Sequence, residues 1–322
     1  PDFEKSYNYL DIYISDYSHL IRSNFRKAEE SMKAGLTLVV PVYNEIGAIE
    51  NSIIHLREIK KNCKDFNFEI IIVNDGSTDG TEKILRGITK DKDLKVVHHP
   101  KNRGYGAALK TGIKASQYPY IAITDADATY PDERIPEFFR DVMENDLDML
   151  VGARTGESVK IPLIRRPPKW VINQLANFMT GTKIPDLNSG LRIMKKEVIE
   201  RFIHFLPDGF SFTSTITISM LAKGYQVKYV PINYHQRKGK SKIRPFYDTL
   251  NFVKLIIRTV MFFDPLKVFL PISLPLLFGG FIFIIVQLVL YKNIDTISVL
   301  ITLSGLNILT VGMLAEMIAN KN

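Results

Sequence analysis

The chain has 322 residues and a formal net charge of +8, enough length for one large domain or two smaller ones with a substantial core. Its mean hydropathy of +0.00 averages two unlike parts, a segment typical of a soluble α/β domain and a membrane-like carboxy-terminal segment. The single cysteine, Cys63, excludes an internal disulfide and agrees with a reducing compartment.

Residues 1–35 predict an amphipathic helix, because apolar side chains recur there at helical spacing. These side chains are Leu10, Ile14, Tyr17, Ile21, Phe25 and Ala28. We expect this helix to pack on the following domain, with a position on the membrane surface as the less favoured alternative. No signal peptide is expected at the start of the chain.

Residues 36–235 repeat the pattern of strand, polar turn and helix. The expected strands cover residues 36–40, 68–73, 94–98 and 120–123, and the first expected helix covers residues 48–62. Ser77 or Thr78 is expected to cap the helix after the second strand. The repetition predicts an α/β fold with a largely parallel sheet covered by helices.

The turn after the third strand carries Gly104 and Gly106, which allow close approach of another backbone. Leu109 stands where the dinucleotide-binding fingerprint has its third glycine. The turn is also not a phosphate-cradling loop, which ends in Gly-Lys-Ser or Gly-Lys-Thr. Glycines of this kind are usually only geometric, so the turn by itself indicates little about function.

Asp125 and Asp127 follow the fourth expected strand, at the edge where an α/β sheet binds ligands. Alternate residues of an extended strand share a face, so we expect both carboxylates to point the same way. Such hard oxygen ligands hold a divalent cation on phosphates. By itself the pair could equally be solvated loop residues or a helix cap.

Residues 266–322 predict a transmembrane hairpin. Residues 268–291 and 296–315 contain no charged side chain, and each stretch is long enough to cross a bilayer as a helix. A buried core helix is the alternative for the second stretch, which contains Ser304 and Asn307. The short connection between the stretches predicts that both ends of the hairpin lie on one side of the membrane.

Residues 236–265 hold a concentration of positive charge next to the expected spans. A basic flank marks the cytoplasmic side and attracts anionic lipid headgroups, and nucleic-acid binding is improbable beside membrane spans. Apolar residues of this segment share one helical face with polar residues opposite, which predicts a helix in the membrane interface. The apolar face consists of Phe246, Leu250, Val253, Ile257 and Val260.

Together these features resemble the inverting glycosyltransferases of family two with the GT-A fold. The resemblance is carried by residues 40–45 (VPVYNE), 73–79 (VNDGSTD), 102–104 (NRG) and 124–127 (TDAD). Residues 151–154 (VGAR), 186–192 (DLNSGLR) and 237–242 (RKGKSK) are similar to the polyprenyl-phosphate branch, typified by dolichyl-phosphate mannose synthases and undecaprenyl-phosphate glucosyltransferases. The resemblance covers residues 36–318, including the paired spans.

The resemblance implies a donor site in which a nucleoside-diphosphate sugar is held by Pro41, Tyr43, Glu45, Asp75 and Asp125. It further implies that Asp125 and Asp127 engage the diphosphate and its magnesium or manganese ion. Each donor residue has a structural alternative, since Pro41 could simply end a strand, Tyr43 could pack and Asp75 could cap a helix. Thr129 replaces a glutamine common in relatives, which puts metal ligation by that position in doubt.

The acceptor implied by the resemblance is a polyprenyl monophosphate. The side chains expected at its phosphate are Arg154, Arg165, Ser189, Arg192, Arg237, Lys238 and Lys242, with Arg154 also counted among the catalytic residues. Arginine can grip phosphate through paired hydrogen bonds. Arg165 could instead be a membrane-surface charge, and Lys238 stands where mannose synthases tend to have arginine.

The acceptor phosphate is mostly ionised near neutrality, with a second pKa of about 6, and needs no strong general base. Direct displacement would then invert the anomeric centre. Two alternatives remain open, a sugar-nucleotide pyrophosphorylase and a non-catalytic membrane scaffold with a transferase-like domain. The expectation is therefore an integral membrane enzyme with a cytoplasmic catalytic domain, no nucleic-acid partner and a possible homo-oligomeric state.

Overall fold

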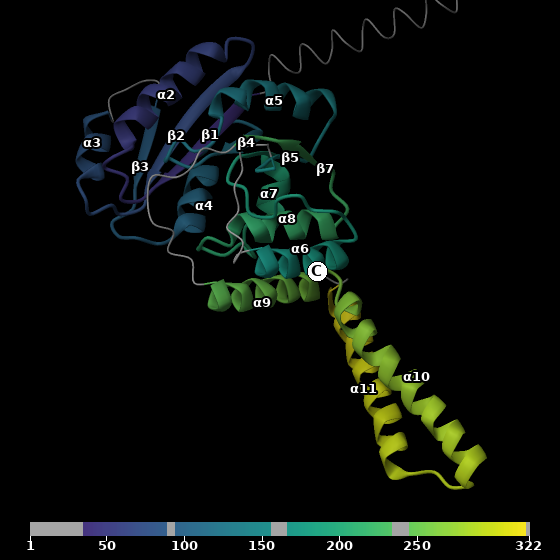
Figure 1. Cartoon of the computed structure of the whole chain (residues 1–322). Helices are drawn as coiled ribbons and strands as arrows, with labels where there is room; N and C mark the ends of the chain where they lie inside the picture. The colour runs from purple at the N-terminus through teal and green to yellow at the C-terminus, as the bar shows by residue number, and fades with distance from the viewer. Residues whose placement is uncertain (1–34, 89–93, 156–165, 234–244, 320–322) are drawn as a thin grey trace, which may run out of the picture.

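The computed structural model describes residues 35–88, 94–155, 166–233 and 245–319, and in the last two segments the side chains from 172 and from 253 onward. An α/β domain occupies the first three segments, and a pair of long helices projects from it (Figure 1). The expected amino-terminal helix and basic loop fall on residues 1–34 and 234–244, which lie outside the described residues.

Seven strands form one mixed sheet in the order β3-β2-β1-β4-β6-β5-β7. Their bounds are β1 Gly35–Val42, β2 Asn67–Asn74, β3 Leu94–His98, β4 Tyr120–Ile123, β5 Met149–Ala153, β6 Arg192–Lys195 and β7 Val227–Pro231. Strands β3, β2, β1 and β4 pair in parallel, as do β5 and β7, whereas β6 runs antiparallel to both neighbours. The predicted, mostly parallel α/β fold is confirmed, and the antiparallel β6 is an addition to it.

The strands read as continuous apolar runs because helices cover both faces of the sheet. Every residue of β1 is buried. Leu38 belongs to a core shared with Phe138 on one face, whereas its neighbour Val39 belongs to a core shared with Phe212 on the other. The alternation along β1 therefore supplies side chains to two cores, which fix the strand ends in space.

The helices of the domain match the periodic segments of the sequence. Their bounds are α2 Ile49–Asn62, α3 Thr81–Gly87, α4 Tyr105–Ala115, α5 Ile135–Glu144, α6 Arg166–Thr180, α7 Lys196–Phe202 and α8 Phe212–Ala222. The prediction that Ser77 or Thr78 caps α3 is wrong. Gly80 occupies the cap position with a φ of 102°, and the Ser77 hydroxyl instead accepts a hydrogen bond from Asn44 N.

Helix α9, Pro245–Phe263, lies along the domain on the side from which the hairpin projects (Figure 1). Its side chains Ile256 and Val260 are fully buried in a core with residues of α6 and α8, including Ala176 and Ile218. Of the expected apolar face, Val260 is buried against the domain, Val253 and Ile257 are half-buried, and the side chains of Phe246 and Leu250 are outside the described ones. A position of α9 in the membrane interface stays a prediction. Lys254, Arg258 and Phe262 face outward.

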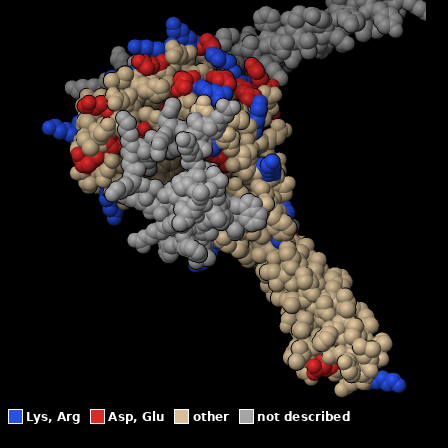
Figure 2. Space-filling view, in the orientation of Figure 1, with Lys and Arg blue, Asp and Glu red and all other residues tan. Residues whose placement is uncertain are grey.

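Helices α10, Leu266–Tyr291, and α11, Thr296–Ala319, form an antiparallel hairpin. Both are long and apolar enough to cross a membrane. Figure 2 shows the hairpin as almost entirely uncharged, with acidic and basic side chains at its tip. The helices approach closely at Gly280 and Gly305, where an added Cβ would collide with the backbone or side chain of the facing helix, a contact typical of membrane helix pairs.

Candidate donor and acceptor site

The carboxyl ends of β1, β2 and β4 meet at one edge of the sheet, and the turns that follow them are bonded together. Asn44 N donates to Ser77 Oγ at 3.0 Å, and Thr78 N donates to Asn44 Oδ1 at 2.7 Å. Glu45 N donates to Thr81 Oγ1 at 3.1 Å. The turns after β1 and β2 are thus one unit, whose polar groups lie where a parallel sheet presents its ligand site.

Pro41, Tyr43 and Glu45, the expected nucleoside contacts of β1, differ in how open they are. Pro41 is buried at the end of the strand, and Glu45 is half-buried. Tyr43 is 45% exposed, so its ring does not pack into the core and remains available to a ligand. A direct contact of any of the three with the nucleoside stays a prediction.

Asp75 is almost completely buried and holds the turn before α4 in place. Its Oδ1 lies 2.7 Å from His99 Nδ1 and accepts from Arg103 N at 2.9 Å, while Oδ2 accepts from Gly104 N at 2.8 Å. His99 Nε2 in turn lies 2.9 Å from the Thr111 hydroxyl. Asp75 therefore holds the turn that leads into α4 and does not cap the helix, which has Gly104 at its N-cap and no side-chain cap bond. Its contact with the nucleoside stays a prediction.

Asp125 and Asp127 lie in a turn that begins where β4 ends at Ile123, so strand alternation does not set their directions. Ala128, in the same turn, has a left-handed φ of 53°. The Tyr105 hydroxyl donates to Asp125 Oδ1 at 3.0 Å. Asp127 Oδ1 accepts from Thr129 N at 3.2 Å and from Thr129 Oγ1 at 2.6 Å, which turns the Thr129 hydroxyl toward Asp127.

The two carboxylates fit a divalent cation that is shared with a diphosphate. Among the described residues, no group of three or more His, Cys, Asp or Glu side chains is placed to enclose a metal ion. A protein-only cage is therefore absent from that part of the chain. Magnesium is commonly held by one or two carboxylates together with substrate phosphates, and Asp125 and Asp127 provide this number.

Asp132 lies behind this turn, and sequence reasoning did not identify it. It is 3% exposed, and its carboxylate accepts a hydrogen bond from the Thr124 hydroxyl. Burial, with a contribution from the charge of Asp125, raises the pKa of Asp132 to about 7. Ser52 supports the same turn from α2 by donating to Ala126 O at 2.5 Å. No motif signals this support, because Ser52 is far from Ala126 in the sequence and Asp132 belongs to none of the motifs.

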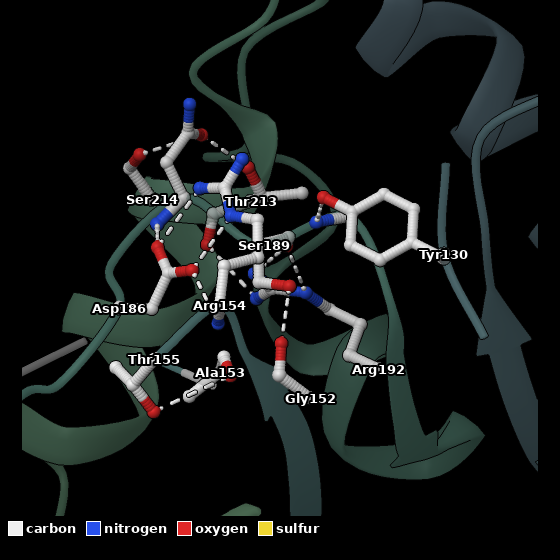
Figure 3. A network of polar contacts seen from close by, with 12 residues as sticks. Tyr130, Gly152, Ala153, Arg154, Thr155, Asp186, Ser189, Arg192, Thr213 and Ser214 are labelled. Atoms are coloured by element: carbon white, nitrogen blue, oxygen red, sulfur yellow. Dashed lines mark hydrogen bonds and ion pairs between the residues drawn. The ribbon is translucent and has the colours of Figure 1, made fainter. Parts of the chain in front are cut away.

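Arg154 follows β5 and forms a paired hydrogen bond with Asp186. Its Nε lies 2.7 Å from Asp186 Oδ2 and its Nη2 lies 2.9 Å from Oδ1, while Arg154 N also donates to Oδ2 at 3.0 Å. The Arg154 side chain is 25% exposed and that of Asp186 only 3%. A buried carboxylate therefore orients the guanidinium (Figure 3). Part of the Arg154 side chain is exposed.

Ser189 and Arg192 are completely buried in the network around this pair (Figure 3). The Ser189 hydroxyl donates to Gly152 O at 2.5 Å. Arg192 donates to Ser189 O, to Thr213 O at 3.0 Å and to Thr217 Oγ1 at 2.9 Å. In this arrangement neither side chain reaches solvent, so a direct contact with an acceptor phosphate would require the network to open.

Gly190 connects the two halves of the site. Gly190 N donates to the Tyr130 hydroxyl at 2.7 Å, and an added Cβ at this position would lie 2.9 Å from Asp125 Oδ2. The other expected acceptor residues, Arg165, Arg237, Lys238 and Lys242, lie outside the described residues. The structure thus brings Asp125 and Asp127 together with the loop that carries Ser189 and Arg192, and leaves the basic residues of the acceptor loop undescribed.

Comparison with known proteins identifies the family. The family model described as glycosyl transferase family 2 matches residues 37–203, just over half of the chain. The chain belongs to glycosyl transferase family 2. A second family model, described as the GtrB C-terminal hairpin, matches residues 264–320, the segment of α10 and α11.

Two relatives confirm the resemblance to the polyprenyl-phosphate branch. The chain is 30% identical over 212 residues to the dolichyl-phosphate hexose transferase of Haloferax volcanii, covering 66% of this chain and 87% of the relative. It is 27% identical over 303 residues to the dodecaprenyl-phosphate galacturonate synthase of Rhizobium johnstonii, covering 88% and 87%. With two further relatives included, the chain spans between 58% and 94% of the relatives' length.

Solved structures confirm the GT-A fold. The glucosyl-3-phosphoglycerate synthase of Mycobacterium tuberculosis, in complex with Mn²⁺, UDP-glucose and phosphoglyceric acid, superimposes with a TM-score of 0.56. The superposition covers 73% of this chain and 82% of that enzyme, and the sequences are 17% identical. At this identity the likeness concerns the fold alone.

Proposed function

We propose that this protein transfers a sugar from a nucleoside-diphosphate sugar to a polyprenyl monophosphate, with inversion at the anomeric carbon, at the cytoplasmic face of a membrane. The observation that carries the proposal is that one chain contains both a ligand edge suited to a nucleotide sugar and helices suited to a membrane. The Asp125 and Asp127 turn stands at the ligand edge of the sheet, and two membrane-length helices follow the same domain. The Rhizobium relative spans both parts.

The donor half of the proposal assigns roles to the turns after β1, β2 and β4. Tyr43 is open enough to lie against the nucleoside, and Asp75 fixes the backbone of Arg103 and Gly104 beside it. Asp125 and Asp127 would hold magnesium or manganese on the diphosphate. The cation would absorb the charge that develops on the departing nucleoside diphosphate. Mn²⁺ and UDP in the structural neighbours support this choice.

The acceptor half of the proposal places Arg154 at the lipid phosphate, with help from Arg165, Arg237, Lys238 and Lys242 of the undescribed loops. Arg154 is suited to this role because Asp186 already orients its guanidinium and part of the side chain is exposed. An ionised phosphate is itself the nucleophile, so the chain has to position it in line with the anomeric carbon. We infer that Ser189 and Arg192 support this arrangement from inside the protein.

The test uses the full chain in detergent micelles with Mg²⁺ or Mn²⁺. We expect one combination of a UDP-hexose or GDP-mannose with dolichyl or undecaprenyl phosphate to give a glycosylated lipid phosphate in a mass spectrum, with release of the nucleoside diphosphate. Formation of pyrophosphate from a sugar phosphate and a nucleoside triphosphate would favour the pyrophosphorylase alternative. Absence of any product across the panel would favour the scaffold. The comparisons give no support to a homo-oligomer, so the proposal concerns a single chain.

The cytoplasmic orientation can be tested with single cysteines at Ile54 on α2 and Asn293 in the hairpin connection, both exposed. The native Cys63 is a silent background, because burial raises the pKa of its thiol to about 12. We expect a membrane-impermeant reagent to label the Ile54 position from the cytoplasmic side and the Asn293 position from the opposite side. Labelling of both positions from one side would contradict the hairpin topology.

A further inference from the structure

The end of α9 and the turn between α7 and α8 share a cluster of aromatic side chains. Phe205, in the turn, lies with its ring centroid 4.1 Å from that of Phe262 and 6.3 Å from that of Phe263. Phe263 is the buried member and also packs against Phe202 of α7 at 5.6 Å. The cluster therefore fixes the turn to the last residues of α9.

The outer rings of this cluster, together with Met261, which precedes Phe262 on α9, are exposed and apolar. Phe205 is 46% exposed, Met261 38% and Phe262 37%. Large apolar side chains in a group on the surface mark a contact with another apolar phase. We call these three side chains the aromatic patch, although Met261 contributes a thioether.

The chain itself indicates which phase covers the patch. Phe262 is four residues before Leu266, the first residue of the membrane-length helix α10, so the patch continues the apolar surface of the hairpin. Lys254, Arg258 and Phe262 are spaced four residues apart and share the outward face of α9, opposite the buried Ile256 and Val260. Basic and aromatic side chains on one helical face are typical of a helix that lies on anionic headgroups.

A further basic side chain borders the patch. The Lys223 ammonium, at the end of α8, lies 5.5 Å from the centroid of the Phe263 ring. Positive charge close to an exposed apolar patch suits the boundary between anionic headgroups and acyl chains. We propose that Phe205, Met261 and Phe262 form a lipid-contacting patch through which the catalytic domain rests on the bilayer beside the hairpin.

The patch also sets the position of the site relative to the lipid. Residues 205–210 run from Phe205 to the start of α4, beside the Asp125 turn. Asp208 O accepts from Ala107 N at 3.0 Å, and neither Gly104 nor Gly106 has room for a Cβ beneath residues 207–208. Phe210 stacks on Tyr105 at a centroid distance of 5.6 Å, and the Tyr105 hydroxyl donates to Asp125. The segment that touches lipid at one end therefore holds the Asp125 turn at the other.

The test reads location and needs no substrate, so its outcome is independent of the proposed function. Trp170 is replaced by Phe to give a tryptophan-free chain, and single tryptophans are introduced as Phe205→Trp, Phe262→Trp and Met261→Trp. The matched control is Ile54→Trp, which is 55% exposed on α2, on the far side of the sheet from the hairpin. The full-length variants are reconstituted in vesicles of phosphatidylcholine and phosphatidylglycerol, with or without bromine on the acyl chains.

We expect the brominated lipid to remove about half of the fluorescence at positions 205, 261 and 262, and to leave position 54 unchanged. Quenching at 261 and 262 without quenching at 205 would overturn the proposal, because the turn would then lie off the bilayer. A blue-shifted emission without quenching would also overturn it, since a second protein surface would then cover the patch. Position 261 provides a third reading if a tryptophan at 205 or 262 disturbs folding, which circular dichroism detects.

Discussion

The two halves of the site are built in different ways. In the half formed by β1 to β4, polar side chains belong to short turns. Some of them bond to near neighbours, as Asp127 does with Thr129, and others join one turn to the next, as Ser77 does with Asn44 N. In the half formed by β5 to β7 and α8, charged side chains pair across long stretches of chain. Arg154 binds Asp186, and Arg192 binds residues of α8.

This difference separates binding groups from supporting groups. A short polar turn at a strand end places carboxylate groups at the edge of the sheet where ligands bind, and the Asp125 and Asp127 turn has this form. A buried arginine that donates to several carbonyl oxygens is already saturated, and removing it would leave those acceptors without partners. Substitutions in the first half should therefore change chemistry, and those deep in the second half should change stability.

The largest effect on activity is expected for Asp127→Asn. The amide oxygen can still accept from Thr129, so the turn should keep its shape while the charge that would hold the cation is lost. We expect a loss of activity of about 100-fold or more with an unchanged melting temperature. Both are measured on the purified chain with Mn²⁺ at several concentrations.

Asp79→Asn is the matched control for Asp127→Asn. Asp79 Oδ1 accepts from the backbone and hydroxyl of Thr81 at 3.0 and 2.6 Å, as Asp127 Oδ1 does from Thr129, and Asp79 Oδ2 also accepts from Ile46 N at 3.0 Å. This variant should keep most of its activity. Equal losses in both variants would show that the turns matter for shape, and the assignment of Asp127 to the cation would be wrong.

The next largest effect is expected for Gly190→Ala, which tests the contact between the halves. The new methyl group would lie 2.9 to 3.1 Å from the Asp125 carboxylate, which can rotate away at little cost to folding. A displaced carboxylate should lower activity by about 10- to 100-fold, because catalysis is sensitive to shifts of about 1 Å.

Gly47→Ala provides the comparison for Gly190→Ala. Gly47 lies in the turn after β1, and an added Cβ there meets nothing within 4 Å. Its variant should retain normal activity and melting temperature. A Gly190→Ala protein with full activity would mean that Asp125 tolerates displacement and does not bind the reacting diphosphate.

Much of the first half was predictable because its signals are local. The strands expected at residues 36–40, 68–73 and 120–123 lie within two residues of the observed bounds of β1, β2 and β4, since buried parallel strands read as continuous apolar runs. The capping of α3 was not predictable in the same way. Gly80 takes the cap position, and the Ser77 hydroxyl is used by the neighbouring turn of β1, a contact between distant residues.

The second half was less predictable for the same reason. The sequence marks Ser189 and Arg192 as polar residues in a motif, which suggested a ligand contact. Their burial depends on α8 packing over them, and on Thr213 and Thr217 being placed to accept from the guanidinium. The outward direction of Lys254 and Arg258 on α9 was predictable, but the face that α9 would pack against was not, because it depends on α6 and α8.

Arg192→Lys should affect stability more than chemistry. A lysine keeps the charge but cannot reach Ser189 O, Thr213 O and Thr217 Oγ1 together, so we expect a loss of about 2 to 4 kcal/mol in the free energy of unfolding. Activity at low temperature should fall only a few-fold. Arg140→Lys, at an exposed ion pair with Asp65, should change neither quantity appreciably.

An opposite pattern would revise the comparison between the halves. If Arg192→Lys raised the KM for the lipid acceptor and left the melting temperature unchanged, Arg192 would contact the acceptor phosphate in a state with the network open. The second half would then be a binding surface and not a support.

The smallest effect on activity is expected for Asp132→Asn, which tests whether the first half also contains a supporting group. Burial raises the pKa of Asp132 to about 7, so the folded protein holds the proton more tightly than the unfolded chain does. Below its unfolded pKa of about 4, the carboxyl group therefore does not lower the free energy of unfolding. As the pH rises from about 4 to about 7, it lowers that free energy by an increasing amount. Above that pH the full cost is present.

Asparagine imitates the protonated acid and can still accept from the Thr124 hydroxyl. A cavity of about 10 Å³ beside Asp132, lined also by His55 and Asp125, is large enough for one water molecule that could accept from the new amide. We expect the melting temperature of Asp132→Asn, in chelator-treated protein, to exceed that of the parent by about 5 °C at about pH 8. Near pH 5 the difference should be much smaller, because the parent is then protonated. An equal difference at both pH values would mean that Asp132 does not titrate in this range and that its effect comes from packing alone.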